Sequence, residues 1–202
     1  MKTQGADPVS NPRTPAVDID PMFTDRWSPR AYDAEHEVTE DEIASVMEAA
    51  RWSPSSYNEQ PWVFVYARSK EDHARFLELL VEGNRKWADQ APVLIFALAK
   101  RTFDKNGKPN RHYAFDTGAA WMAMSLQARK LGLYTHGMAG FHEDKAYEAL
   151  GVDREKYEVM AAIALGRRAD ASTLDDEGMR KGEKPNDRKP LEKVAYEGRF
   201  SA

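Results

Sequence analysis

The sequence predicts a single domain that combines helices with a buried sheet, on three observations. Helical and strand-like segments alternate along the 202 residues. Runs of β-branched, aromatic and aliphatic residues are typical of buried strands, at residues 62–67, 92–99 and 157–165. A helix over about 112–131 carries no charge from Thr117 to Ala128, so it should be buried on every side, against its own domain and a partner subunit.

Two helices in the first half of the chain are predicted from their end signals. Thr39 followed by Glu42 forms a capping box, which predicts a helix over residues 40–52. Ser69 is expected to cap a second helix that ends near Gly83.

Two other segments flank the uncharged helix. The polar loop at residues 101–111 precedes it, and the glycine-rich residues 135–141 follow it. A further helix over about 143–150 is expected to end at Gly151, because glycine favours the left-handed conformation found after helix ends.

Composition excludes several classes of protein. The formal net charge of −4 argues against a nucleic-acid partner, since binding of phosphate backbones usually requires a basic domain. The chain has no cysteine, which excludes disulfides and thiolate metal sites and is compatible with the reducing cytoplasm, where we expect the protein. The five histidines show no metal-ligand spacing. The uncharged stretch is too short to span a bilayer, so no membrane partner is expected.

The chain is expected to have one globular domain with an arm at each end. Residues 1–20 contain three prolines and no apolar run, which predicts a flexible arm rather than a signal peptide or anchor. The domain is assigned to residues 21–168. The segment 169–202 is dense in charge until apolar residues return near its end, which is typical of an arm that lies against another surface.

Two segments concentrate hydrogen-bonding groups. One is the loop at residues 53–61, which holds three serines, an asparagine, a glutamine and two prolines, more than a simple connection needs. In the other, Arg26 and Arg30 flank Ser28, an arrangement that suits a phosphate and a second electron-rich atom. Taken alone, each segment could also be an ordinary surface loop. Together they indicate a nucleotide-like cofactor.

These segments resemble the FMN-dependent nitroreductase family in order and spacing. The matching patterns are Arg-x-Ser-x-Arg-x-aromatic at residues 26–32 and Pro-Ser-Ser-x-Asn-x-Gln-Pro-Trp at residues 54–62. The resemblance, from about Phe23 to Phe200, implies an α+β nitroreductase-like fold with a mixed, mainly antiparallel sheet flanked by helices. It also implies a homodimer that binds two FMN molecules non-covalently at the subunit interface, with the C-terminal arm on the partner subunit.

The resemblance also assigns residues to parts of the flavin. It implies that Arg26, Ser28 and Arg188 hold the phosphate. It places Arg30 at flavin N1 and the C2 carbonyl, where a fixed cation stabilises the charge that reduction adds, and this is its catalytic role. Asn58 would contact the pyrimidine edge.

The backbone supplies the remaining contacts in the family. Pro54, Ser55 and Ser56 would line the flavin ring. The glycine-containing segment after the central helix would offer N–H groups to flavin N5, through Met138, Ala139 and Gly140. The family often has an acidic residue where this chain has Ala139, so only the backbone role carries over.

The implied activity is a ping-pong oxidoreduction in which NAD(P)H reduces the flavin and an electron-poor acceptor then reoxidises it. Nitroaromatics, quinones, activated alkenes and small aldehydes suit this class. The short segment 101–111 predicts a more open pocket than in larger members. Two alternatives stay open: a flavin carrier or redox sensor without turnover, and an FMN-free interaction protein. Asp116 could cap the helix, pair with an arginine or face the substrate pocket.

Overall fold

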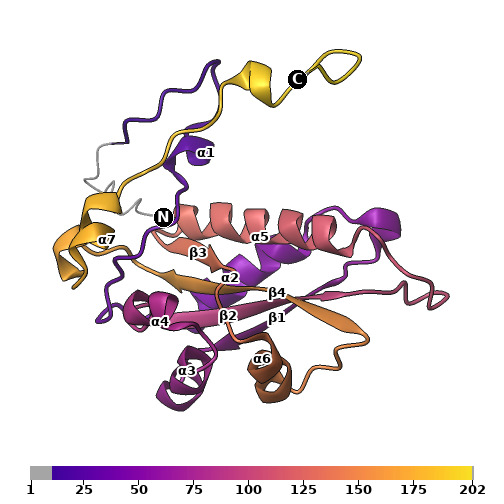
Figure 1. Cartoon of the computed structure of the whole chain (residues 1–202), viewed down its shortest axis with the longest axis horizontal. Coiled ribbons are helices and arrows are strands. Elements are labelled where there is room, and N and C mark those ends of the chain that lie inside the picture. The colour runs from indigo at the N-terminus through magenta and orange to yellow at the C-terminus, as the bar shows by residue number, and fades with distance from the viewer. Residues whose placement is uncertain (1–10, 202) are drawn as a thin grey trace.

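The domain is built around a four-stranded antiparallel sheet (Figure 1). The computed structural model describes residues 11–201. In spatial order the strands are β1 (Trp62–Ala67), β2 (Val93–Lys100), β4 (Tyr157–Gly166) and β3 (Tyr134–Met138). Helices pack on both faces of this sheet. The predicted α+β class is confirmed, and every pairing between these strands is antiparallel.

Strand β2 forms the centre of the core because its side chains are buried on both faces. Ile95 and its alternate neighbours point to the face covered by α2 (Glu40–Arg51) and α5 (Tyr113–Lys130). Phe96 and its alternate neighbours point to the opposite face. This accounts for the continuous apolar run in the sequence, since a strand covered on both sides needs no polar alternation.

Three short helices cover the second face of the sheet (Figure 1). They are α3 (Lys70–Leu77), α4 (Glu82–Ala88) and α6 (Glu143–Leu150). Each contributes a buried side chain to one apolar cluster with Phe96, namely Phe76, Trp87 and Ala146. The helix predicted at 143–150 is confirmed, and Gly151 ends it in the left-handed conformation with φ 65°.

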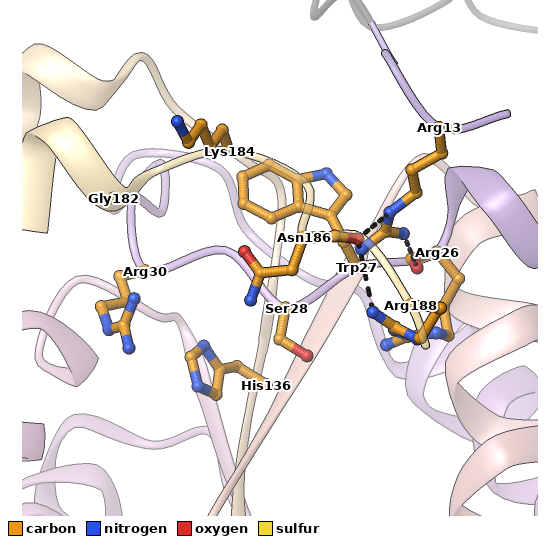
Figure 2. A pocket seen from close by; sticks show the side chains of 10 residues that line it. All are labelled: Arg13, Arg26, Trp27, Ser28, Arg30, His136, Gly182, Lys184, Asn186 and Arg188. Carbon is orange, nitrogen blue, oxygen red and sulfur yellow. Dashed lines mark hydrogen bonds between the residues drawn. The ribbon is translucent and has the colours of Figure 1, made fainter. Parts of the chain in front are cut away.

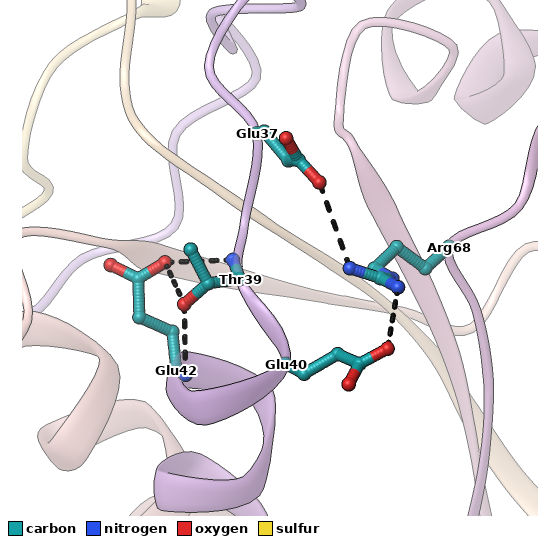
Figure 3. A network of polar contacts seen from close by, with 5 residues as sticks. All are labelled: Glu37, Thr39, Glu40, Glu42 and Arg68. Atoms are coloured by element: carbon teal, nitrogen blue, oxygen red, sulfur yellow. Dashed lines mark hydrogen bonds and ion pairs between the residues drawn. The ribbon is translucent and has the colours of Figure 1, made fainter.

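The capping box predicted at the start of α2 is confirmed. Thr39 Oγ1 accepts a hydrogen bond from Glu42 N at 3.2 Å, and Glu42 Oε2 accepts one from Thr39 N at 2.9 Å. Figure 3 shows this box beside Arg68, which pairs with Glu40 at 2.8 Å and with Glu37 at 3.7 Å. These carboxylates are exposed, so the ion pairs contribute little stability. They nevertheless join the start of α2 to the end of β1.

The helix predicted from Ser69 to near Gly83 is wrong in its second half. Ser69 caps α3 as expected, but the helix ends at Leu77 and Gly83 lies inside the separate helix α4. The chain turns because its backbone bonds elsewhere: Leu79 O accepts from His142 N at 2.7 Å, and Val81 N donates to Gly140 O at 3.1 Å. These long-range bonds outweigh the local preference for helix.

Two strand expectations also need correction. Residues 134–138 form strand β3, which the glycine content of this stretch concealed. Strand β1 has the predicted bounds but is only partly buried, with Val63 and Tyr66 exposed, because it lies at the edge of the sheet.

The expected burial of α5 on every side is not met within one chain. Ala120 and Met124 are buried against the sheet, whereas Phe115 is 80% exposed and Met122 is 36% exposed on the outer face. This outer face is nearly uncharged, which is costly for a helix surface in water.

The segment from residue 11 to residue 25 runs next to the C-terminal arm, above the sheet in this view (Figure 1). The N-terminal segment contains α1 (Pro21–Asp25), and the C-terminal arm contains α7 (Glu177–Gly182). Of the predicted flexible arm 1–20, residues 1–10 lie outside the described residues, and residues 11–20 form no helix or strand. Among the helices described, none is long and apolar enough to cross a membrane.

Gly166, at the end of β4, offers a test of packing at the end of the sheet. A Cβ atom there would lie 2.6 Å from Pro92 Cδ and 3.0 Å from Tyr32 Cδ1, and the proline ring cannot rotate away. We expect Gly166→Ala to lower the free energy of unfolding by about 1–3 kcal/mol in urea denaturation. Gly83→Ala is the matched control, because no atom lies within 4 Å of the added Cβ. Equal stability of the two variants would contradict the packing argument.

Candidate functional site

A cavity of about 170 Å³ lies where the N-terminal segment meets the C-terminal arm (Figure 2). Its lining is rich in cations, and no described residue that lines it is acidic. The lining residues are Arg13, Arg26, Trp27, Ser28, Arg30, His136, Gly182, Lys184, Asn186 and Arg188. A space of this size fits a phosphate group.

The segment that carries Arg26 and Arg30 is held by buried contacts on both sides. Trp27 is buried and packs edge-on against Tyr134, with ring centroids 6.1 Å apart. The backbone N–H groups of Arg30 and Ala31 donate to Glu183 Oε1 at 2.8 and 2.9 Å. The guanidinium groups therefore project from a backbone that cannot easily move.

Arg188 reaches the cavity from the C-terminal arm. Its backbone N–H donates to Asp187 Oδ1 at 2.8 Å. Its Nη1 donates to the carbonyl oxygens of Asp187 at 3.0 Å and Asn186 at 3.3 Å. The structure thus brings Arg26, Ser28, Arg30 and Arg188 to one cavity, although Arg188 is distant in the sequence.

The electrostatics of the cavity favour an anion. Burial lowers the pKa of Arg26, and the nearby charges of Arg188 and Arg13 lower it further. A lowered arginine pKa means that the positive form is destabilised by its surroundings. A bound phosphate would relieve this repulsion, so the residues present fit a phosphate-bearing cofactor.

His136, on strand β3, lies against the same cavity. Its Nδ1 is 2.8 Å from the carbonyl oxygen of Pro29, which can only accept, so the proton resides on Nδ1. Burial lowers the pKa of His136 to about 4, and the charges of Arg30 and Arg26 act in the same direction. The imidazole is therefore neutral at pH 7.

Asp116 shows how the loop at residues 53–61, the serine-rich loop, is attached to α5. Its side chain is buried, and Oδ2 accepts a hydrogen bond from Ser56 N at 3.0 Å. This role of attachment is not among the three that the sequence left open: Asp116, in the first turn of α5, accepts a hydrogen bond from a loop N–H.

The serine-rich loop is held in an uncommon conformation. Tyr57, Asn58 and Gln60 have positive φ values of 54°, 57° and 54°. The left-handed region is costly for residues other than glycine, and such strain concentrates at functional sites. Ser55 Oγ accepts from Gln60 N at 2.9 Å and so stabilises the turn internally.

The short segment 101–111 packs against this loop. Asp104 N donates to Glu59 Oε1 at 2.6 Å, and the rings of Tyr57 and Phe103 meet edge-on at 5.9 Å. Tyr57 is 94% exposed, so the pair forms a projecting aromatic edge next to the loop.

The loop and the arginine cavity lie at different ends of α5 in one chain (Figure 1). Ser56 bonds Asp116 in the first turn of α5, whereas Trp27 packs on Tyr134, just beyond its last turn. A helix of 18 residues is about 27 Å long. Consequently, a single chain does not bring Pro54, Ser55, Ser56 and Asn58 to the cavity.

The predicted N5 segment lies beyond β3. Met138 is buried in the core, Ala139 is exposed, and Gly140 O accepts hydrogen bonds from Val81 N and from Asn84 Nδ2 at 2.9 Å. A Cβ atom on Gly140 would lie 2.6 Å from Asn84 Nδ2, so glycine is needed here for close packing. Contact of these residues with a cofactor stays a prediction.

Sequence reasoning missed several lining residues, namely Arg13, Trp27, His136, Lys184 and Asn186. Arg13 and Lys184 lie in segments without periodic pattern, so nothing local indicated their role. His136 could have been found only by recognising the strand that carries it.

The comparisons with known proteins agree with this geometry. The family model for the Nitroreductase family matches residues 23–86 and 72–167. The chain therefore belongs to the nitroreductase family, as the sequence resemblance predicted. A solved structure described as an oxidoreductase containing FMN is similar, with a TM-score of 0.90 and 41% identity over 96% of this chain and 98% of that chain.

Curated relatives share less of the sequence. The CLA biosynthesis enone reductase of Lactiplantibacillus plantarum is 22% identical over 75% of this chain and 86% of its own length. The oxygen-insensitive NAD(P)H nitroreductase of Enterobacter cloacae is 34% identical over 44% of this chain and 42% of its own length.

The lowered pKa of His136 predicts a pH-dependent stability. The folded pKa of about 4 is below the ordinary 6.5, so the unfolded chain binds more protons between these values. This contribution should leave stability unchanged above pH 7 and reduce it by on the order of 3 kcal/mol as the pH falls from 6.5 to 4. Urea denaturation across this window should show a shallower loss for His136→Asn. Parallel curves for the two proteins would refute the assignment.

Proposed function

We propose that the chain is an FMN-dependent NAD(P)H oxidoreductase that acts on electron-poor small molecules as a cytoplasmic homodimer. One observation carries this proposal: Arg26, Arg30 and Arg188, which the sequence resemblance assigned to the flavin, converge on a phosphate-sized cavity whose described lining residues include no carboxylate. Membership of the nitroreductase family and the likeness to an FMN-containing oxidoreductase support the choice of cofactor.

Arg26, Ser28 and Arg188 would hold the phosphate of the cofactor. Two guanidinium groups and a hydroxyl supply several donors around one small volume, which matches the acceptor oxygens of a phosphate monoester. The cavity is charged before any ligand arrives, so electrostatic attraction also favours association.

Arg30 and His136 would act at the inner side of the same site. The backbone bonds to Glu183 fix Arg30, so its charge can stabilise negative charge that reduction adds to the ring system, without a large reorganisation. His136 Nδ1 donates its proton in a hydrogen bond to the carbonyl oxygen of Pro29. The imidazole carries no charge at pH 7. When bound, FMN supplies the hydride chemistry in two half-reactions, first with NAD(P)H and then with the acceptor.

A two-fold dimer would complete the site. The serine-rich loop of one chain and the arginine cavity of the same chain are separated along α5, and a symmetric partner can supply the missing half to each. The exposed, uncharged outer face of α5 is suited to such an interface. Leu191, Val194 and Phe200 of the C-terminal arm are also exposed and apolar, which supports packing of this arm on the partner subunit.

The acceptor is proposed by class only: nitroaromatics, quinones, activated alkenes or small aldehydes. The segment 101–111 is short and packs on the serine-rich loop, which favours an open pocket. The curated names of relatives include nitroreductases and an enone reductase, so both nitro and activated alkene acceptors belong in the test.

The decisive experiment is an absorbance spectrum of purified protein before and after anaerobic NAD(P)H. We expect a flavin spectrum that is bleached by NAD(P)H and restored by a quinone or nitroaromatic acceptor. Bleaching without reoxidation by any acceptor would favour a carrier or sensor. Protein that is colourless and ignores added FMN would refute the proposal.

Replacing the phosphate arginines should weaken FMN binding more than it affects folding. We expect Arg26→Ala and Arg188→Ala each to raise the Kd for FMN by about tenfold or more, because a hydrogen bond to a charged group is lost. Fluorescence titration of apoprotein measures this. Arg75→Ala is the control, since Arg75 pairs with Asp72 on α3, away from the cavity. Unchanged affinity in both cavity variants would contradict the assignment.

Subunit complementation tests the shared site. Arg26→Ala and Asn58→Ala change residues that we assign to opposite halves, so each homodimer should have two defective sites. Random exchange of the two variants should restore about a quarter of wild-type activity, because each mixed dimer has one intact site. No recovery after verified exchange would mean that both residues serve the site of the same chain.

A further inference from the structure

Arg13 links two segments that are far apart in the sequence. Its Nη1 donates to the carbonyl oxygens of Thr24 at 2.9 Å and Arg26 at 2.8 Å, while its Nε donates to the carbonyl oxygen of Asn186 at 2.6 Å. Figure 2 shows the side chain bridging these segments at the edge of the cavity. Arg13 precedes the region that the family model matches, which begins at residue 23.

The carbonyl oxygen of Asn186 is a shared acceptor. Arg13 Nε and Arg188 Nη1 both donate to it, at 2.6 and 3.3 Å. Arg13 therefore donates to the carbonyl oxygen of Arg26 on one side. On the other side it donates to the carbonyl oxygen of Asn186, which also accepts from Arg188. A single side chain sets the relative position of the two arginines proposed to bind phosphate.

The charges of these residues oppose this arrangement. Burial and the charge of Arg188 lower the pKa of Arg13, while Asp187 acts in the opposite direction. Three guanidinium groups held together repel one another. A structural tie between two arms would not require an arginine beside two other guanidinium groups, whereas an anion site gains from one.

We propose that Arg13 is a positioning residue of the phosphate site. It holds the backbone at Arg26 and Asn186 so that the side chains of Arg26 and Arg188 contact one phosphate group; we call this arrangement the clamp. The inference rests on the proposed function for the identity of the ligand. The clamp also couples two events thermodynamically. Phosphate binding strengthens the docking of the two arms on each other, and this docking strengthens phosphate binding.

The arms have further contacts that should survive loss of the clamp. Beyond Arg13, the two segments line an apolar groove in which Pro15, Val17 and Phe23 face Pro190 and Leu191. Glu183 independently fastens the C-terminal arm through the N–H groups of Arg30 and Ala31. Arg13→Ala should therefore fold, with the arms held less closely.

The test compares FMN with riboflavin, which lacks the phosphate, in titrations of the apoprotein dimer. For Arg13→Ala we expect the Kd for FMN to rise about tenfold or more and the Kd for riboflavin to change by less than about twofold. Arg13→Lys retains the charge but cannot span all three carbonyl oxygens, so it should resemble Arg13→Ala. Arg75→Ala should match wild type, and melting temperatures of the apo forms check folding.

The outcomes separate the clamp from simpler roles. Equal losses for FMN and riboflavin would make Arg13 a general structural residue and overturn the proposal. Wild-type affinity in Arg13→Lys would show that charge alone matters and would overturn the clamp. Binding of inorganic phosphate, measured by isothermal titration calorimetry, is the second probe, because the cavity is of the size of a phosphate group. Phosphate binding without FMN binding in wild type would refute the proposed function. In that case weaker phosphate binding by Arg13→Ala would still support the clamp, and unchanged phosphate affinity would overturn it.

Discussion

The arrangement of both arms depends on one constraint, which is that several guanidinium groups are held close together around one cavity. Arg13, Arg26 and Arg188 would separate if their backbones were free, because like charges repel at short range. Buried polar contacts oppose this separation: Glu183 accepts from the backbone beside Arg30, and Arg13 bridges to the C-terminal arm. The site is therefore organised by hydrogen bonds to the main chain, which leave the guanidinium ends available for an anion.

The sheet and α5 decide which groups can belong to one site. Strand β2, buried on both faces, makes the core rigid, and α5 lies across it as a spacer between the serine-rich loop and the arginine cavity. Neither end alone brings together all the residues that we propose to bind the cofactor. The proposed two-fold dimer would account for three features at once: the strained loop with Tyr57 and Asn58, the uncharged outer face of α5 and the exposed apolar residues of the C-terminal arm.

Local sequence was sufficient where short-range interactions dominate. The capping box of Thr39 and Glu42 started α2 as predicted, and the apolar run of β2 indicated a strand covered on both sides. It failed where long-range hydrogen bonds compete with propensity. The turn between α3 and α4 forms because its backbone pairs with the segment after β3, and the glycine content of β3 hid a strand that is defined by pairing with β4.

The sequence by itself determined the family, the class of fold and the residues of the two cofactor patterns, because these depend on residue type and spacing. Only the tertiary structure decided which of them meet. It brought Arg188 to Arg26, placed Asn58 at the other end of α5 and added Arg13 and His136 to the cavity. The physical reason is that spacing along a chain sets local geometry, whereas convergence of distant residues depends on how the sheet, the helices and the arms pack.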